Sequence, residues 1–333
     1  MSRWLCLIAL FAVPATPQDD WFLVALRFDA KGTLYVADAK GGRVHAIETT
    51  DKAAKAAKVK IDDLGAALAK ALNGNAGDVH VYALAVHPLS HAVYLSGSRV
   101  NGGPSTLFRV NAKGELDALP MKDLKMKTAA LPKGCQPLDL VVGPTGLIVS
   151  STVRDKNFLA RLHVIALPLA DAVGTADSEL YHVSHEAWET QAPLNAMTTY
   201  EKDKKTYVLG STMCTPVVRL DAADVVDKKK VKSSTIVELG MGNAAVTLAV
   251  YTKEKKPMLL VSSEEATYSI EGKVLDEAEK INEKAINRNK GEVDGVKVLD
   301  AWKQVSKFAL LDEVSFVVIK RGAKMSLETV ELP

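Results

Sequence analysis

The chain has 333 residues, of which 47% are hydrophobic and 25% are charged, a composition typical of a folded globular protein. The 42 Lys and Arg residues nearly balance the 40 Asp and Glu residues, and the formal net charge is +2. A protein that binds nucleic acid needs a concentrated basic surface to neutralise phosphates. The near balance of charge therefore argues against nucleic acid as a partner.

The first 15 residues predict a secretory signal peptide. Arg3 precedes an apolar run over residues 4–13, and the small-residue sequence VPA ends at Ala15. A membrane anchor or a buried strand is the alternative, but the run is shorter than the ~20 residues that a membrane-spanning helix requires. We expect cleavage after Ala15 and a secreted or periplasmic single domain over residues 16–333, a monomer without a membrane span.

Six segments of the chain share one pattern of an apolar strand, a short polar turn, a second apolar strand, a loop and a third strand. They cover residues 22–48, 81–110, 137–167, 194–220, 245–270 and 306–332. Each second strand carries a large side chain at a shared position, at intervals of about 52 to 59 residues, which is in the range of propeller blade repeats. These side chains are Tyr35, Tyr94, Ile148, Tyr207, Leu259 and Phe316.

Many short strands with hairpin turns at regular intervals predict an all-β fold, a six-bladed β-propeller. The sequence DAKGTLYVAD of the first segment resembles the six-bladed propellers of the broad NHL-repeat and SMP-30 (gluconolactonase)-like group. The resemblance covers nearly the whole chain after Ala15, and it implies a fold rather than an activity because such blades serve many functions.

Further strands and two short helical insertions are expected between the segments. Fourth strands are predicted near residues 58–61, 115–119, 180–184, 235–239 and 296–299. The chain ends directly after the sixth segment, so we expect a three-stranded last blade without strand exchange. Leu64, Leu68 and Leu72 have the spacing of one helix face, as do apolar residues within 274–291. Both helices should cover the outside of the ring.

The loops that lead into each first strand share one face of a propeller with the loops that follow each second strand. We call this the loop face and expect it to bind a ligand or a protein partner. Its arginines favour a small anionic ligand, because guanidinium pairs well with carboxylate and phosphate groups. The candidate ligand-binding residues are Asp38, His80, Arg99, Gln136, Arg154, Gln191, Asn195, Asn243, Glu264 and Arg321.

Two of the three cysteines fall in neighbouring segments on the loop face. In an exported protein, Cys135 and Cys214 are expected to form a disulfide. Two buried free thiols, or a reactive or metal-binding pair, are the alternatives.

A metal-dependent hydrolase, similar to a lactonase, is the alternative function. The SMP-30-like family holds a divalent ion at the channel mouth with Glu, Asn and Asp, and Asn195 occupies the matching asparagine position. The family's later acid falls on Gly210 here, and only Asp19 and Asp20 precede the first strand. The resemblance thus implies a calcium or zinc ion with Asp20 and Asn195 as ligands, although a hard divalent ion prefers more oxygen ligands.

Overall fold

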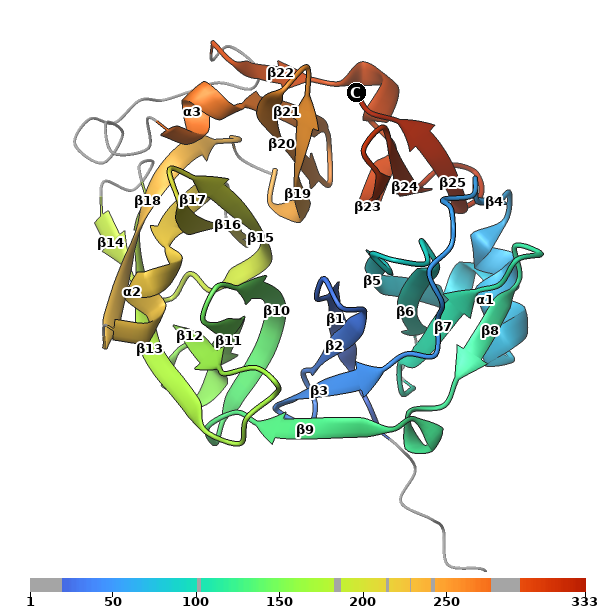
Figure 1. The fold of residues 1–333 in the computed structure, drawn as a ribbon, viewed down its shortest axis with the longest axis horizontal. Helices are drawn as coiled ribbons and strands as arrows, with labels where there is room; N and C mark the ends of the chain where they lie inside the picture. Colours follow the sequence, from blue (N-terminus) through green and yellow to red (C-terminus); the bar gives the residue numbers. More distant parts are fainter. Residues whose placement is uncertain are drawn as a thin grey trace, which may run out of the picture.

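The structure is a computed structural model that describes residues 20–100, 103–182, 187–213, 216–227, 229–240, 243–276 and 294–333. Its β-sheets stand radially around a central axis in a propeller-like ring (Figure 1). The expected signal peptide lies outside the described residues.

Four sheets of the ring are separate blades of four strands each. The first contains β1 (Leu23–Phe28), β2 (Thr33–Asp38), β3 (Arg43–Glu48) and β9 (Met126–Ala130). The second contains β5 (Val79–Val86), β6 (Val93–Arg99), β7 (Thr106–Val110) and β8 (Leu116–Leu119). The third contains β19 (Ala245–Lys253), β20 (Lys256–Ser263), β21 (Thr267–Glu271) and β22 (Val296–Val298). The fourth contains β23 (Val305–Asp312), β24 (Ser315–Lys320), β25 (Ser326–Glu331) and β4 (Lys60–Ile61).

The third and fourth predicted segments are joined in one nine-stranded sheet, so the structure has four separate blades where six were predicted. One part contains β10 (Cys135–Gly143), β11 (Gly146–Val153), β12 (Leu159–Ile165), β13 (Val173–His182) and β14 (Ala187–Glu189). The other contains β15 (Leu194–Lys202), β16 (Lys205–Thr212), β17 (Pro216–Asp221) and β18 (Lys230–Glu238). Parallel pairing between β13 and β18 over residues 177–180 and 230–233 connects the two parts.

Strand exchange closes the ring, contrary to the expectation of a three-stranded last blade. β4 follows β3 in the chain but pairs with β25, the last strand. β9 then returns to the first sheet and pairs with β3. The second blade consequently lies between the first and the last: β5 contacts β1 and β23, whereas β1 contacts β10 on its other side (Figure 1).

Each strand nearest the axis contains a β-bulge, at which it has one residue more than its partner strand. The extra residues near the start of these strands are Val24, Tyr82, Leu138, Asn195, Val246 and Ser306, and β23 has a second one, Leu311, near its end. A bulge bends a strand and redirects its side chains. The six bulges near the strand starts therefore decide which side chains of the inner strands reach the axis.

Serines on the second strands form hydrogen bonds to the neighbouring blade next to these bulges. The hydroxyl of Ser262 donates a hydrogen bond of 2.6 Å to the carbonyl of Val305 in the next blade. Ser96 donates in the same way to Leu23, and Ser211 to Ala245, at 2.9 and 3.3 Å. Each acceptor directly precedes a bulge. Apolar residues between the blades, such as the fully buried Leu34, Leu147 and Phe316, complete the contacts.

The predicted helix over residues 61–75 is confirmed as α1 (Leu64–Leu72), which contacts β6 and β8. Asp63 caps its first turn by accepting a hydrogen bond from the Ala66 amide, and Asn73 ends it in the left-handed conformation. Leu64 and Leu68 are buried on its inner face. Two further helices are α2 (Ala222–Asp227), which was not predicted, and α3 (Gly272–Asp276).

The second predicted helix falls mostly outside the described residues, which resume at Asp294. Single helical turns complete the fold: η1 (Ala76–Asp78), η2 (Met121–Asp123), η3 (Arg154–Lys156) and η6 (Asp300–Trp302). Among the described helices, none has the length and apolar character required to cross a bilayer.

Candidate functional site

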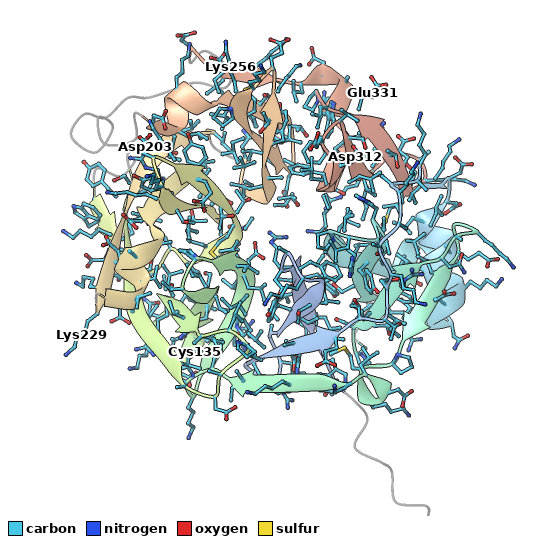
Figure 2. All side chains as sticks on the ribbon, in the orientation of Figure 1. Cys135, Asp203, Lys229, Lys256, Asp312 and Glu331 are labelled. Carbon is cyan, nitrogen blue, oxygen red and sulfur yellow. The ribbon has the colours of Figure 1, made fainter. Side chains whose placement is uncertain are left out.

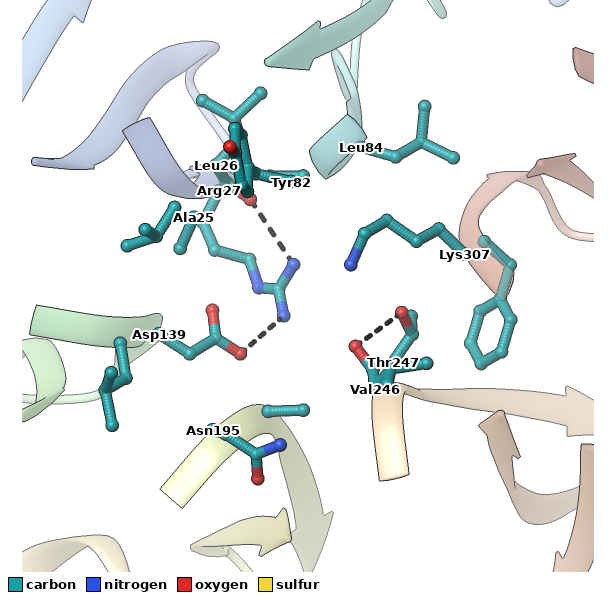
Figure 3. Close-up of a pocket in the computed structure, with 15 residues that line it drawn as sticks. Ala25, Leu26, Arg27, Tyr82, Leu84, Asp139, Asn195, Val246, Thr247 and Lys307 are labelled. Carbon is teal, nitrogen blue, oxygen red and sulfur yellow. Dashed lines mark hydrogen bonds and ion pairs between the residues drawn. The ribbon is translucent and has the colours of Figure 1, made fainter. Parts of the chain in front are cut away.

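A narrow channel along the axis of the ring is lined by residues of all six inner strands. Its volume is about 50 Å³, and Figure 3 shows the side chains that line it. A water molecule needs about 10–15 Å³, so the channel has room for only a few waters or one small ion. Each inner strand contributes one polar side chain to a lining that is otherwise apolar: Arg27, Tyr82, Asp139, Asn195, Thr247 and Lys307.

Asp139 and Arg27 form an ion pair across the channel. Arg27 Nη2 lies 3.3 Å from Asp139 Oδ2 and also donates to the Met197 carbonyl at 2.8 Å. The Asp139 carboxylate accepts hydrogen bonds from the amides of Met197 and Leu140, at 2.6 and 2.8 Å. Burial raises the pKa of Asp139, although Arg27 and the two amides oppose the shift.

Lys307 faces this pair from β23, and its ammonium group points toward the Arg27 guanidinium (Figure 3). The pKa of Lys307 is lowered to about 8, mainly by burial and to a smaller extent by the positive charges of Arg321 and Arg27, while Asp139 opposes the shift. Within the described part of the chain, the ammonium makes no hydrogen bond or ion pair. It is therefore a cation without a paired anion in a narrow space.

A second, much larger pocket opens on the loop face, where three neighbouring first strands begin. Its volume is about 990 Å³, at the upper end of the range of small-molecule sites. Most of the lining comes from the loops around β1, β10, β11, β15 and β16, and β14 and the loops after β2 and β6 add the rest. We call this second pocket the loop-face pocket. It is lined by Asp20, Trp21, Phe22, Val24, Ala39, Lys40, Gly103, Gln136, Leu138, Thr152, Arg154, Asn157, Phe158, Glu189, Gln191, Ala192, Pro193, Thr212 and Met213.

The loop-face pocket presents large apolar side chains that the fold leaves uncovered. Phe158 is 55% exposed and Met213 is 76% exposed. Phe158 also has a φ of 59°, directly after Asn157 at 54°. A bulky residue rarely adopts this left-handed conformation, and such strain gathers at functional sites. The backbone thus holds an aromatic ring at the pocket wall at a conformational cost.

Polar groups without partners accompany these apolar side chains. The side chain of Arg154 makes no hydrogen bond or ion pair to another described residue. Thr152 Oγ1 and Trp21 Nε1 are buried in the lining and likewise find no hydrogen-bond partner among the described residues. Lys40, in contrast, is paired with Asp20. The pocket can therefore offer a free guanidinium beside an apolar surface.

The structure brings three predicted ligand-binding residues together in the loop-face pocket: Gln136, Arg154 and Gln191. Glu264 and Arg321 line a separate hollow between the last two blades of the chain. Arg99 is exposed at the end of β6 and lines none of these pockets.

His80 is exposed on β5 and lines neither the channel nor the loop-face pocket. Its ring packs against Tyr82 at 4.7 Å. The surrounding protein and the charges of Lys307 and Arg321 lower the pKa of His80.

Two other predicted ligand-binding residues are fully buried, and their side chains form hydrogen bonds to other residues of the protein. Asp38 accepts hydrogen bonds from the Phe22 amide and from Arg43, at 3.0 and 3.2 Å. Asn243 donates to the Leu239 carbonyl and accepts from Ser263. Because neither side chain is open to solvent, these residues position loops and are not available to a ligand.

The residues implied as metal ligands do not fit a divalent cation. Asn195 lines the channel and donates to the Ala245 carbonyl at 3.0 Å, whereas Asp20 lines the loop-face pocket beside Lys40. Around Asn195, one carboxylate faces two cationic side chains, Arg27 and Lys307, which repel a positive ion. No group of three or more His, Cys, Asp or Glu side chains suited to a metal occurs in the described ranges.

Cys135 is a buried free thiol at the start of β10, so the predicted disulfide is not found (Figure 2). Its Sγ lies 3.8 Å from Arg161 Nη1. Cys214, the predicted partner, lies outside the described residues.

Sequence reasoning missed the charged residues of the channel. Arg27, Asp139 and Lys307 each interrupt an apolar first strand, in ALRFD, PLDLVV and SKFALL. A charged residue within a strand that is otherwise buried was the available signal. Phe158 was missed because its exposure depends on the turn before β12.

No family model matches the chain, and no curated protein matches it. The resemblance to the SMP-30-like group therefore has no support from a family match.

Solved structures with a similar arrangement include a virginiamycin B lyase from Staphylococcus aureus with quinupristin. It is 10% identical over 95% of this chain and 97% of that one, with a TM-score of 0.44. A PQQ-bound aldose sugar dehydrogenase from Streptomyces coelicolor is 9% identical over 93% of this chain and 97% of that one, with a TM-score of 0.37. Because the sequence identities and the TM-scores are this low, these similarities say nothing about the function of the chain.

Proposed function

We propose that this protein is an exported binding protein whose loop-face pocket takes an amphipathic organic anion. The observation that carries the proposal is the free guanidinium of Arg154 beside exposed apolar side chains in a pocket of about 990 Å³. A volume in the range of small-molecule sites favours a small ligand over the flat surface of a protein partner.

The lining indicates how such a ligand would be held. Trp21, Phe158 and Met213 would cover an aromatic or aliphatic body of the ligand. Arg154 would pair with a carboxylate, sulfonate or phosphate group, and a guanidinium can do so through two parallel hydrogen bonds. Gln136 and Gln191 would supply further hydrogen bonds at the same rim.

The fluorescent dye 8-anilinonaphthalene-1-sulfonate tests this proposal, because it combines aromatic rings with a sulfonate. We expect saturable binding to the folded protein with a fluorescence increase. Arg154→Gln should weaken the affinity by about tenfold, as expected for the loss of one charge-assisted hydrogen bond. Phe158→Ser should weaken it similarly through lost apolar contact.

Matched control variants lie elsewhere on the ring. Arg99→Gln removes an exposed arginine outside the pocket, and Val226→Ser removes an apolar side chain that is 50% exposed on α2. Both should bind the dye like the wild type. Equal affinity in all five proteins, or dye binding only after unfolding, would refute the pocket as the site.

Export also belongs to the proposal, on the basis of the basic residue, apolar run and small-residue site at the N-terminus. Expression of the full chain in a bacterial host, followed by N-terminal sequencing of the periplasmic fraction, provides the test. A chain beginning at Thr16 would support export, and an intact chain confined to the cytoplasm would contradict it.

We further propose that the nine-stranded sheet acts as two blades, which makes the ring six-bladed. β10 and β15 each line the channel as the first strands of the separate blades do. The parallel pairing covers only four residues on each strand. A crystal structure would decide between two sheets in contact at this edge and one continuous sheet.

A further inference from the structure

The charges in the central channel do not balance. Of the polar side chains that line it, Arg27 and Lys307 are cationic, and Asp139 is the only carboxylate. Tyr82, Asn195 and Thr247 are neutral. Lys307 is partly buried, and a cation that gives up part of its water without gaining an ion pair or hydrogen bonds lowers the stability of the fold.

Other hydrogen-bond donors in the channel are already used within the protein. Asn195 donates to the Ala245 carbonyl, and Thr247 donates to the Val246 carbonyl at 2.7 Å. Both terminal nitrogens of Arg27 contact protein acceptors. The Lys307 ammonium, with three N–H groups, has no acceptor among the described residues.

We propose that the channel binds one small inorganic anion, of the size of chloride, between the Lys307 ammonium and the Arg27 guanidinium. The channel volume of about 50 Å³ is large enough for such an ion and too small for most organic ligands. The anion would balance the surplus positive charge and accept the free N–H groups of Lys307. The channel adjoins the loop-face pocket, with which it shares the lining residues Val24 and Leu138, but no polar side chain lines both.

Protonation of Lys307 controls the proposed site. Its pKa of about 8 leaves the ammonium mostly charged at pH 7. The groups that act on it are Asp139, Arg27, Arg321 and His80. Bound anion should stabilise the charged ammonium and raise the pKa, and affinity should fall as the pH rises above 8.

Chloride NMR on the full protein tests the proposal at pH 7. We expect saturable broadening of the ³⁵Cl signal, which bromide displaces. Lys307→Met should weaken chloride binding by about tenfold or more, the loss expected for one charge-assisted hydrogen bond. Lys303→Met is the control, because Lys303 is exposed and lines a different hollow.

Crystals of the wild type in sodium bromide provide a readout that does not require a variant. An anomalous peak in the channel within hydrogen-bond distance of Lys307 Nζ would support the proposal. A channel without such a peak would overturn it, as would equal broadening by the wild type and Lys307→Met.

Discussion

Asp139 on β10 is bound by Arg27 from β1, 3.3 Å away across the channel, and by the amide of Met197 from β15. One carboxylate thereby joins three neighbouring inner strands near the axis. The same carboxylate offsets one of the two positive charges in the channel. Its position links the stability of the ring to the charge state of its centre.

Asp139→Asn should destabilise the protein, because both carboxylate oxygens accept hydrogen bonds, from Arg27, Met197 and Leu140, and the variant replaces one of these oxygens by an NH2 group that cannot accept. Removing one partner of a buried pair costs about 3–5 kcal/mol, and partial exposure of Arg27 reduces the expected loss to about 2 kcal/mol. Urea denaturation measures the change in the free energy of unfolding. Asp62→Asn, which removes a solvent-exposed partner of Lys60, is the control and should change it by less than about 0.5 kcal/mol.

Lys307→Met should increase stability at pH 7 in a buffer with gluconate, an anion too large for the channel. The folded-state pKa of Lys307 is about 8 against an ordinary value of 10.5, so the native state binds fewer protons than the unfolded state between these values. Wild-type stability should therefore rise with pH across this window, relative to the variant. We expect the free energy of unfolding of the variant to exceed that of the wild type by about 1 kcal/mol at pH 7, and the difference to shrink toward pH 10.

Thermal or urea unfolding at several pH values checks this expectation. A stability difference between wild type and Lys307→Met that stays constant from pH 7 to 10 would contradict the assigned burial of the amine. Lys303→Met, on the surface, should show no such pH dependence.

Ser262→Ala should lower the free energy of unfolding by about 1–2 kcal/mol, because the Val305 carbonyl loses its hydrogen bond between blades. Ser150 is the matched control. It lies opposite the residue after a bulge, as Ser262 does, but its hydroxyl has no partner among the described residues. Ser150→Ala should therefore be neutral or slightly stabilising, and equal losses for both variants would argue against a specific role of the bond.

Val59→Pro should weaken the strand exchange that closes the ring. The Val59 amide donates to Thr329 Oγ1 at 2.9 Å, and proline has no amide hydrogen. We expect faster hydrogen exchange over residues 326–331 and a loss of about 1–2 kcal/mol. Lys58→Pro is the control, since the Lys58 amide makes no hydrogen bond to a described residue. Unchanged protection in Val59→Pro would show that closure does not depend on this contact.

The repeated hairpins could be predicted because they depend on neighbouring residues. Alternating apolar side chains and polar turns specify a hairpin locally, and α1 follows from the spacing of Leu64, Leu68 and Leu72. The outer strands were harder to place. Residues 58–61 do contain a strand, but β4 pairs with β25 at the far end of the chain, and no local pattern encodes that choice.

The candidate site was predicted in part. Gln136, Arg154 and Gln191 meet because their loops lie on the same face of the ring, around the two parts of the nine-stranded sheet. Asp38 and Asn243 occur in equivalent loops, yet their short side chains turn inward and bond to the backbone. Whether a loop residue faces solvent depends on packing that the pattern alone does not describe.

By itself, the sequence determined the β-rich repeats, their hairpins and the face on which the long loops gather, because these follow from side-chain periodicity over a few residues. Only the tertiary structure decided the order of the blades, the exchange of β4 and β9, and the meeting of Arg27, Asp139 and Lys307. Those features depend on contacts between residues far apart in the chain, such as Arg27 and Asp139, and on bulges that turn the inner strands toward the axis.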